Sequence, residues 1–244
     1  EDFPEILNFP KLRKMLSLRY GINPGAPAAF YSEEGASGST MADFRVLQEG
    51  RGLGYINVGD MDLGQSIVRL LNSDYQERVA YCIVKHEMPS GVAIATSLED
   101  AFQNAWGSDP LSSFGGVHVA SGQINEEIAR ELVDKERNVE VIYAPAFTGG
   151  ALSILGERKD LRVVQMDDLD NLAVDNGLDY KRVTGGMLVQ PRWETRIHTS
   201  RDLECVSERQ PTQDEINAAL FNWKVAGFTR SNAVVIGTKD RTHG

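Results

Sequence analysis

A lysine and a histidine stand side by side where an apolar segment of the chain ends. Residues 79–84 are mostly residues that favour strands, and Lys85 and His86 follow them directly. The cluster Pro89-Ser90-Gly91 comes soon afterwards and predicts the turn that ends this strand. The layout therefore predicts a cation and an imidazole at the carboxyl end of a strand, where open α/β sheets bind ligands.

This pair has the residue types for proton transfer combined with charge stabilisation. A histidine beside a lysine tends to stay neutral near pH 7, because the ammonium group disfavours a second positive charge. A neutral imidazole can accept a proton as a general base, and the lysine can stabilise a developing oxyanion. A solvated Lys-His pair that merely closes a strand has the same residue types, so the pair alone does not decide between the two interpretations.

The composition excludes several classes of function. The 244 residues carry a formal net charge of −10, which argues against nucleic acid or an anionic membrane as a partner. Four histidines and two cysteines, Cys82 and Cys205, with no CxxC pair, suggest neither a metal site nor a disulfide framework. The sequence shows no secretory signal pattern and no apolar run of the roughly 18–20 residues that a membrane span needs. We therefore expect a cytoplasmic protein without a metal.

Helical and strand-like patterns alternate along the chain. Helices are expected at 62–71 with Asp60 as the cap, from Ser97, from Asn125, at 149–157, and from Thr212 to about Val225. Strands are expected at 79–84, 139–144, 161–165, 182–189, where Gly185-Gly186 weakens the strand or marks a bulge, and 233–237. This alternation predicts a layered α/β fold with a parallel or mixed sheet.

Composition also suggests how the chain is divided. We expect residues 1–18 to be a linker or lead-in and residues 19–211 to form a first α/β subdomain. Residues 212–244 are expected to supply a helix and a strand that open a further part, truncated where the sequence stops. The acidic stretch 166–178 is interpreted as a surface loop.

Common catalytic and nucleotide-binding motifs are missing or incomplete. The glycine-rich segment 50–54 lacks the strand–turn–helix context of a dinucleotide fingerprint in this interpretation, and a flexible hairpin turn is favoured. No GxxxxGK[ST] and no GxSxG segment occurs. His86-Glu87 is superficially similar to the HxE of zinc deaminases, but the spacing differs and no PCxxC follows.

Motifs spread between residues 18 and 236 nevertheless point to one family. They are Leu18-Arg19-Tyr20-Gly21-Ile22-Asn23-Pro24, Gly54-Tyr55-Ile56-Asn57-Val58-Gly59-Asp60, Lys85-His86-Glu87-Met88-Pro89-Ser90-Gly91, Asp109-Pro110-Leu111-Ser112-Ser113-Phe114-Gly115-Gly116, Glu140-Val141-Ile142-Tyr143-Ala144-Pro145, Gly185-Gly186-Met187-Leu188-Val189-Gln190, Trp223-Lys224-Val225 and Arg230-Ser231-Asn232-Ala233-Val234. In this order they resemble the aminoimidazole carboxamide ribonucleotide (AICAR) transformylase region of the bifunctional purine biosynthesis family that also carries inosine monophosphate cyclohydrolase.

The resemblance implies both a fold and a reaction. It implies a layered α/β/α fold with a mixed sheet, similar to cytidine deaminase, and a homodimer. The implied reaction is formyl transfer from 10-formyltetrahydrofolate, as co-substrate, to the 5-amino group of AICAR. By match of motif, His86 is the general base and Lys85 the transition-state stabiliser.

The other implied site residues concern the binding of AICAR. Arg19 and Tyr20 are expected to contact its phosphoribosyl part, and Gly115, Glu140 and Asn232 to line the same site. An arginine fork suits a phosphate or carboxamide oxygen, and a tyrosine ring can stack on a purine precursor.

The sequence also departs from the family pattern. Gly25-Ala26 stands where His-Gln is usual, Met88-Pro89-Ser90 replaces the Asn-Pro-Cys common in bacterial members, and Gly227 replaces a lysine. Two alternatives to the transformylase therefore stay open. One is a non-catalytic nucleotide-binding or regulatory relative with the same fold, and the other is a formyltransferase that uses a different donor.

Overall fold

A six-stranded mixed sheet forms the centre of the computed structural model, which describes residues 3–36, 39–169 and 177–244. Strands β6, β7 and β8 run parallel, while β3 pairs antiparallel with β8, and β4 pairs antiparallel with β6 and β5. In spatial order the strands are β3 (Arg45–Gln48), β8 (Arg162–Gln165), β7 (Val141–Ala144), β6 (Val117–Ala120), β4 (Val79–Lys85) and β5 (Met88–Ala95).

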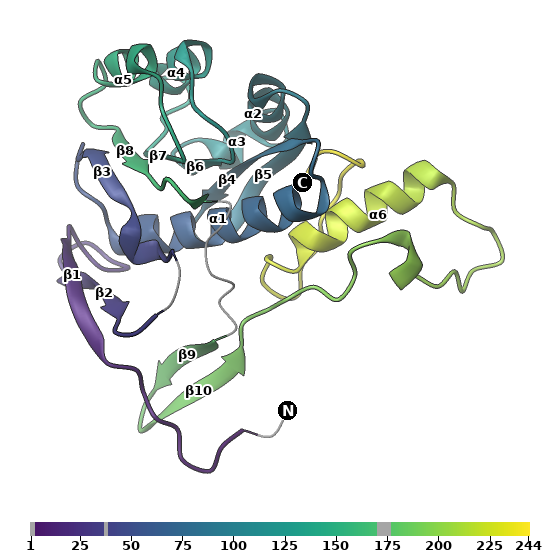
Figure 1. Cartoon of the computed structure of the whole chain (residues 1–244), viewed down its shortest axis with the longest axis horizontal. Coiled ribbons are helices and arrows are strands. Elements are labelled where there is room, and N and C mark those ends of the chain that lie inside the picture. The colour runs from purple at the N-terminus through teal and green to yellow at the C-terminus, as the bar shows by residue number, and fades with distance from the viewer. Residues whose placement is uncertain (1–2, 37–38, 170–176) are drawn as a thin grey trace.

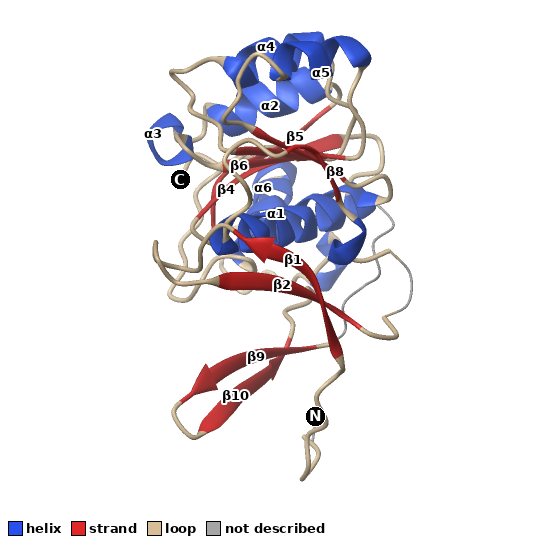
Figure 2. Ribbon diagram, turned by 90° about the vertical axis from the view of Figure 1, so that its left-hand side faces the viewer, coloured by secondary structure: helices blue, strands red, loops and turns tan. Residues whose placement is uncertain are grey.

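Helices cover both faces of this sheet, as Figures 1 and 2 show. On one face lie α1 (Tyr55–Asp74) and α6 (Gln213–Ala226), and on the other lie α2 (Leu98–Trp106), α4 (Glu126–Val133) and α5 (Gly149–Leu155). Each face has its own apolar core, so strand residues are buried on both sides. The predicted layered α/β/α fold with a mixed sheet is confirmed. Among the described residues, none of the helices combines the length and apolar character needed to cross a membrane.

Most of the predicted helix starts are confirmed by their caps. Ser97, Asn125 and Thr212 each accept a hydrogen bond from a backbone N–H in the first turn of the helix that follows. The helix predicted at 62–71 lies within α1, but its predicted start and its Asp60 cap were wrong, because α1 already begins at Tyr55 and contains Asp60 in its buried face. Gly64 lowers the helix propensity there, but its missing side chain lets α1 approach the sheet, since a Cβ would lie 2.4 Å from Val119.

The turn after β4 also differs from its prediction. Lys85 pairs with Met88, so the turn consists of His86 and Glu87, and Pro89 lies within β5. Strand β5 tolerates this proline because it is at the edge of the sheet and β4 is its only strand partner in the described chain.

Two further strand predictions are corrected. Residues 182–189 do not form one strand, because a turn at Thr184-Gly185 divides them between β9 (Leu178–Val183) and β10 (Gly186–Pro191). The segment 233–237 does not form a strand, and Val234 and Ile236 are 77% and 64% exposed. Instead, the backbone around Arg241 pairs with the edge of β5.

Two further hairpins, each a two-stranded sheet of its own, lie below the central sheet in Figure 2. Strand β1 (Leu12–Leu18), in the expected lead-in, pairs with β2 (Ala28–Glu33). The rings of Phe9 and Tyr180 pack 4.8 Å apart, so the N-terminal segment contacts the β9–β10 hairpin. Within the predicted acidic loop, Met166 and Leu169 are buried core residues, while residues 170–176 lie outside the described chain. Short helices η1 (Met41–Asp43), α3 (Pro110–Ser113) and η3 (Ser200–Asp202) complete the described elements.

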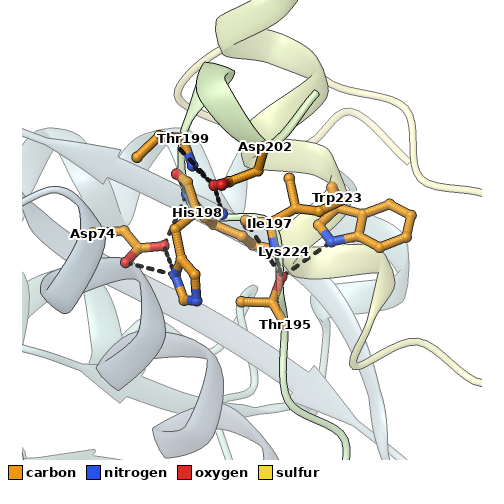
Figure 3. Close-up of polar contacts among 8 residues, drawn as sticks. All are labelled: Asp74, Thr195, Ile197, His198, Thr199, Asp202, Trp223 and Lys224. Carbon is orange, nitrogen blue, oxygen red and sulfur yellow. Dashed lines mark hydrogen bonds and ion pairs between the residues drawn. The ribbon is translucent and has the colours of Figure 1, made fainter. Parts of the chain in front are cut away.

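A polar cluster ties α6 to the end of α1 (Figure 3). The buried ammonium of Lys224 lies 2.9 Å from the Asp74 carboxylate and donates to the carbonyl oxygen of His198 at 3.1 Å. The His198 ring contacts the same carboxylate at 3.0 Å, and Lys224 also lies over the ring of Tyr75. Burial and the nearby Asp74 raise the pKa of Tyr75 to about 12. The cluster therefore pairs a buried cation with an anion at the carboxyl end of α1 and fixes α6 there.

Candidate active site

Most of the predicted site residues gather at one edge of the sheet. Val84 in β4 pairs with Val117, Val117 with Val141, and Val141 with Arg162. The carboxyl end of the antiparallel strand β4 therefore lies beside the amino ends of the parallel strands β6, β7 and β8. Lys85 is at the end of a strand as predicted. However, the rule that ligands bind at the carboxyl ends of parallel strands does not place this site, because β6, β7 and β8 run antiparallel to β4 and begin at this edge.

His86 is at the tip of the β4–β5 hairpin. His86 and Glu87 both have positive φ, 56° and 60°, which is characteristic of a type I′ turn. The buried Asp60 carboxylate of α1 accepts the backbone N–H of His86 at 3.1 Å and that of Glu87 at 2.6 Å. Burial raises the pKa of Asp60 to about 7. The turn thus presents an exposed imidazole on a backbone held by a buried acid.

Lys85 joins this hairpin to the loop that contains Gly115. Its ammonium donates to the carbonyl oxygen of Phe114 at 2.8 Å. Gly115 follows with a φ of +78°, and Gly116 packs so closely on β4 that a Cβ would lie 3.1 Å from the Val84 oxygen. Lys85 and the glycine turn therefore lie side by side.

Glu140 links the same loop to α1 and β8. Its N–H donates to the carbonyl oxygen of Gly116 at 3.1 Å. Its half-buried carboxylate accepts from the Asn57 amide at 3.2 Å and lies 3.5 Å from the Arg162 guanidinium. Burial lowers the pKa of Arg162, although Glu140 opposes this effect. Glu140 is thus positioned by a helix, a loop and a buried cation.

Arg19 and Tyr20 contact the beginning of α1. The backbone N–H of Arg19 donates to the backbone carbonyl oxygen of Leu53 at 2.8 Å. The backbone carbonyl oxygen of Tyr20 accepts from the backbone N–H of Tyr55 at 3.0 Å. The Arg19 guanidinium lies over the Tyr20 ring, 5.3 Å from its centre. Both residues therefore lie where the amino end of a 20-residue helix begins, which favours a bound anion.

The glycine-rich segment 50–54 belongs to this part of the site. It connects β3 to α1, so the predicted hairpin turn was wrong and the segment does have a strand–loop–helix context. The buried Arg162 donates to the Gly52 oxygen at 2.9 Å, and Arg51 pairs with Asp160 at 3.3 Å. The loop thus brings backbone groups and two arginines next to Arg19, despite the negative net charge of the whole chain.

Asn232 is placed less directly than the other predicted residues. It is exposed, and its Oδ1 accepts from the Ser231 hydroxyl at 2.9 Å. Two residues earlier, the Arg230 guanidinium forms an ion pair with the Glu87 carboxylate. This ion pair brings the segment of Asn232 to the His86 turn, while the structure gives no direct contact between Asn232 and the other predicted residues.

Several residues of this network were missed from the sequence, namely Asn57, Asp60, Glu87, Arg162 and Arg230. Asp60 carried a usable signal, because it is seven residues before the core residue Ile67 and therefore shares its helical face. An acidic residue on an apolar helix face needs a buried partner. Arg162, in contrast, looks like any residue that begins a strand.

Comparisons with known proteins cover the whole chain. The model of the family described as AICARFT/IMPCHase bienzyme matches residues 1–244. The bifunctional purine biosynthesis protein PurH of Acidithiobacillus ferrooxidans is 39% identical over 242 residues, which are 99% of this chain and 44% of that protein. The chain therefore spans less than half the length of this relative.

Proposed function

The chain belongs to the AICARFT/IMPCHase bienzyme family, and we propose that it carries the acceptor site for formyl transfer to AICAR in purine biosynthesis. The donor in this proposal is 10-formyltetrahydrofolate. The observation that carries the proposal is a continuous set of contacts around the His86 turn. It joins Lys85 to the Gly115 loop, this loop to Glu140, and Glu140 to the start of α1, where Arg19 and Tyr20 lie.

The chemistry of the acceptor explains the need for a base. The 5-amino group is a poor nucleophile, because its lone pair is delocalised into the imidazole and carboxamide. As its nitrogen attacks the formyl carbon, the His86 imidazole takes the amine proton. The oxygen of the tetrahedral intermediate then carries a negative charge, which the Lys85 ammonium stabilises.

The second half of the reaction reverses the proton transfer. The intermediate collapses by breaking its bond to N10 of the folate, and the imidazolium of His86 returns the proton to that nitrogen. The products are formylated AICAR and tetrahydrofolate, and His86 ends neutral. No net proton and no electron is left over, so the two side chains suffice for the chemistry of this step.

The remaining residues supply binding for an anionic ribonucleotide. Arg19, together with the start of α1, provides positive charge for a phosphate, and Tyr20 provides a flat ring. Glu140 offers a carboxylate that can accept hydrogen bonds from ribose hydroxyls, and Gly115 and Asn232 line the same space. Placing these groups around one ligand would hold its amine near the base, and such positioning can supply roughly 7–11 kcal/mol of a barrier.

We extend the proposal to a cytoplasmic homodimer in the full-length protein. Exposed apolar side chains on the β9–β10 hairpin support self-association, since Leu188 is 57% exposed and Tyr180, Val183 and Met187 are each 38% exposed. The cytoplasm follows from the phosphorylated acceptor, whose charge keeps it from crossing a bilayer. Sedimentation of the full-length protein tests the dimer, and a monomer at micromolar concentration would contradict it.

An assay of the full-length protein with AICAR and 10-formyltetrahydrofolate tests the proposed function. We expect release of tetrahydrofolate that depends on AICAR, and loss of this release in His86→Ala but not in His243→Ala, an exposed histidine near the end of the chain. Binding of AICAR without any turnover would instead favour a non-catalytic relative. Turnover with another formyl donor alone would show that the folate donor is wrongly assigned.

A further inference from the structure

Asp60 is buried inside α1 but directs its carboxylate at the hairpin that carries His86. The residue is 3% exposed, and it lies on the face of α1 that packs on the sheet. Both of its hydrogen bonds among the described residues come from consecutive backbone N–H groups, those of His86 and Glu87. The Asp60 Oδ2 atom accepts from the His86 N–H at 3.1 Å, and the Oδ1 atom accepts from the Glu87 N–H at 2.6 Å. Among the described residues, the Asp60 carboxylate thus has two hydrogen-bond partners in one turn and none in its own helix.

The turn itself needs an external partner. Type I′ turns favour asparagine and glycine, because both central residues have positive φ. Here those positions hold His86 and Glu87, whose side chains make a positive φ unfavourable. The pair of N–H groups converges on the Asp60 carboxylate, and the Glu87 side chain is in turn held by its ion pair with Arg230. The contacts that hold this conformation are therefore supplied from α1 and from the segment after α6.

We propose that Asp60 is a positioning residue, whose ionised carboxylate holds the His86–Glu87 turn so that the imidazole of His86 stays at the reacting amine. This inference rests on the proposed function, because it assumes that His86 is the base. Asp60 acts through the backbone of the turn and contacts neither substrate. It also connects the base to Asn232, since the Glu87 residue whose N–H it binds carries the ion pair to Arg230.

The charge of Asp60 matters because only the anion can accept both N–H groups with full strength. A protonated carboxyl would direct an O–H donor toward the turn and lose part of this interaction. Burial favours the protonated form, and the His86 N–H and the nearby imidazole favour the anion. The charged or titratable groups that face Asp60 or the turn it holds are His86 and Glu87 in the turn, Lys85 and Cys82 on β4, Glu140 before β7, and Arg230 after α6.

Kinetics of Asp60→Asn in the full-length protein form the first part of the test. Asparagine has nearly the same shape but has only one acceptor oxygen, so one of the two N–H groups meets an amide donor. A displaced base should lower kcat by about 10–100-fold, since a misplacement of about 1 Å can have such an effect. The KM for AICAR should stay within about threefold.

A neighbouring acid provides the matched control. Asp62 lies on the same helix, is partly exposed, and accepts from Arg192 at 2.6 Å. Asp62→Asn should keep kcat within about twofold of the wild type. Unchanged kcat in Asp60→Asn, or equal losses in kcat and in AICAR affinity, would overturn the positioning role, because the second pattern indicates general damage to the fold.

A measurement on the wild type separates this inference from the proposed function and does not depend on the variant folding. The backbone N–H signal of Glu87, which donates to Asp60 at 2.6 Å and belongs to a residue without an imidazole, can be observed by NMR after labelling with nitrogen-15, and it should shift with pH with a midpoint near the pKa of Asp60, about 7. In Asp60→Asn this titration should disappear. If the wild type transfers no formyl group, the proposed function fails, and the NMR result still decides whether Asp60 holds the turn. A wild-type Glu87 N–H that does not respond to pH near 7 would overturn the inference.

Discussion

Replacing Asp60 by asparagine should flatten the pH dependence of folding stability. Burial raises the pKa of Asp60 from 3.8 to about 7, so the folded protein binds this proton more tightly than the unfolded chain does. Its contribution to stability is therefore fully present below about pH 3.8 and is lost as the pH rises toward 7. Above about pH 7 both states are ionised and no further loss occurs.

The size of the effect follows from these two pKa values. At about 1.4 kcal/mol for each pH unit, the complete loss is about 4 kcal/mol, and the part between pH 5 and pH 8 is about 2–3 kcal/mol. Asparagine has no proton to lose in this range. The difference in the free energy of unfolding between the wild type and Asp60→Asn should thus change by about 2–3 kcal/mol, with the wild type becoming relatively less stable as the pH rises.

Urea unfolding of both proteins at pH 5, 6, 7 and 8 measures this difference. Contributions of all other titrating groups cancel to a first approximation, because the two proteins differ at one residue. Asp62→Asn should show the same pH dependence as the wild type, since it retains Asp60. A wild-type-to-variant difference that stays constant within about 0.5 kcal/mol would refute the argument that Asp60 is a buried acid with a raised pKa.

Substitutions at His86, Lys85 and Lys224, with a control at Lys239, test other parts of the molecule. His86→Ala should lower kcat by roughly 10²–10⁴ with a much smaller change in AICAR affinity, and steady-state kinetics with activity within about threefold of wild type would rule out a general base there. Lys85→Met should lose roughly 2–4 kcal/mol of transition-state stabilisation. Lys85→Arg should rescue the rate poorly, because a guanidinium is a planar fork rather than a compact charge. A near-normal rate in the arginine variant would show that the exact position of the positive charge is not critical. Lys224→Met should lower the free energy of unfolding by about 3–5 kcal/mol, because it leaves the Asp74 carboxylate without its buried partner. Lys239→Met, which removes an exposed ion pair, should change the free energy of unfolding by less than about 1 kcal/mol. Equal effects of the two substitutions in chemical denaturation would contradict this contrast.

The parts of the fold that could be predicted depend on local chemistry. Ser97, Asn125 and Thr212 cap helices that begin at the next residue, so the signal and its effect lie within four residues. The alternation of helices and strands likewise predicted the layered sheet. Gly59 weakens the helix signal in the first two turns of α1, and its neighbour there, Glu87, is 28 residues later in the chain.

The parts that could not be predicted depend on distant partners. No local turn rule favours His86-Glu87 in a type I′ turn, because the group that binds its N–H groups, Asp60, is 26 residues earlier in the chain. The edge of the sheet that holds the site follows from the antiparallel pairing of β4 with β6, which the sequence does not specify. The roles of Lys85 and His86 came from family motifs, and their assignment as stabiliser and base remains a prediction.

A crystal structure of the full-length protein with AICAR tests the central claim most directly. We predict that the 5-amino nitrogen lies within about 3.2 Å of an imidazole nitrogen of His86. The phosphoribosyl part should extend along the sheet edge past Glu140 toward Arg19. Binding of AICAR elsewhere, for example in the cavity lined by Tyr31, Leu63 and Leu188 between the two lower hairpins and α1, with His86 left free, would contradict the account.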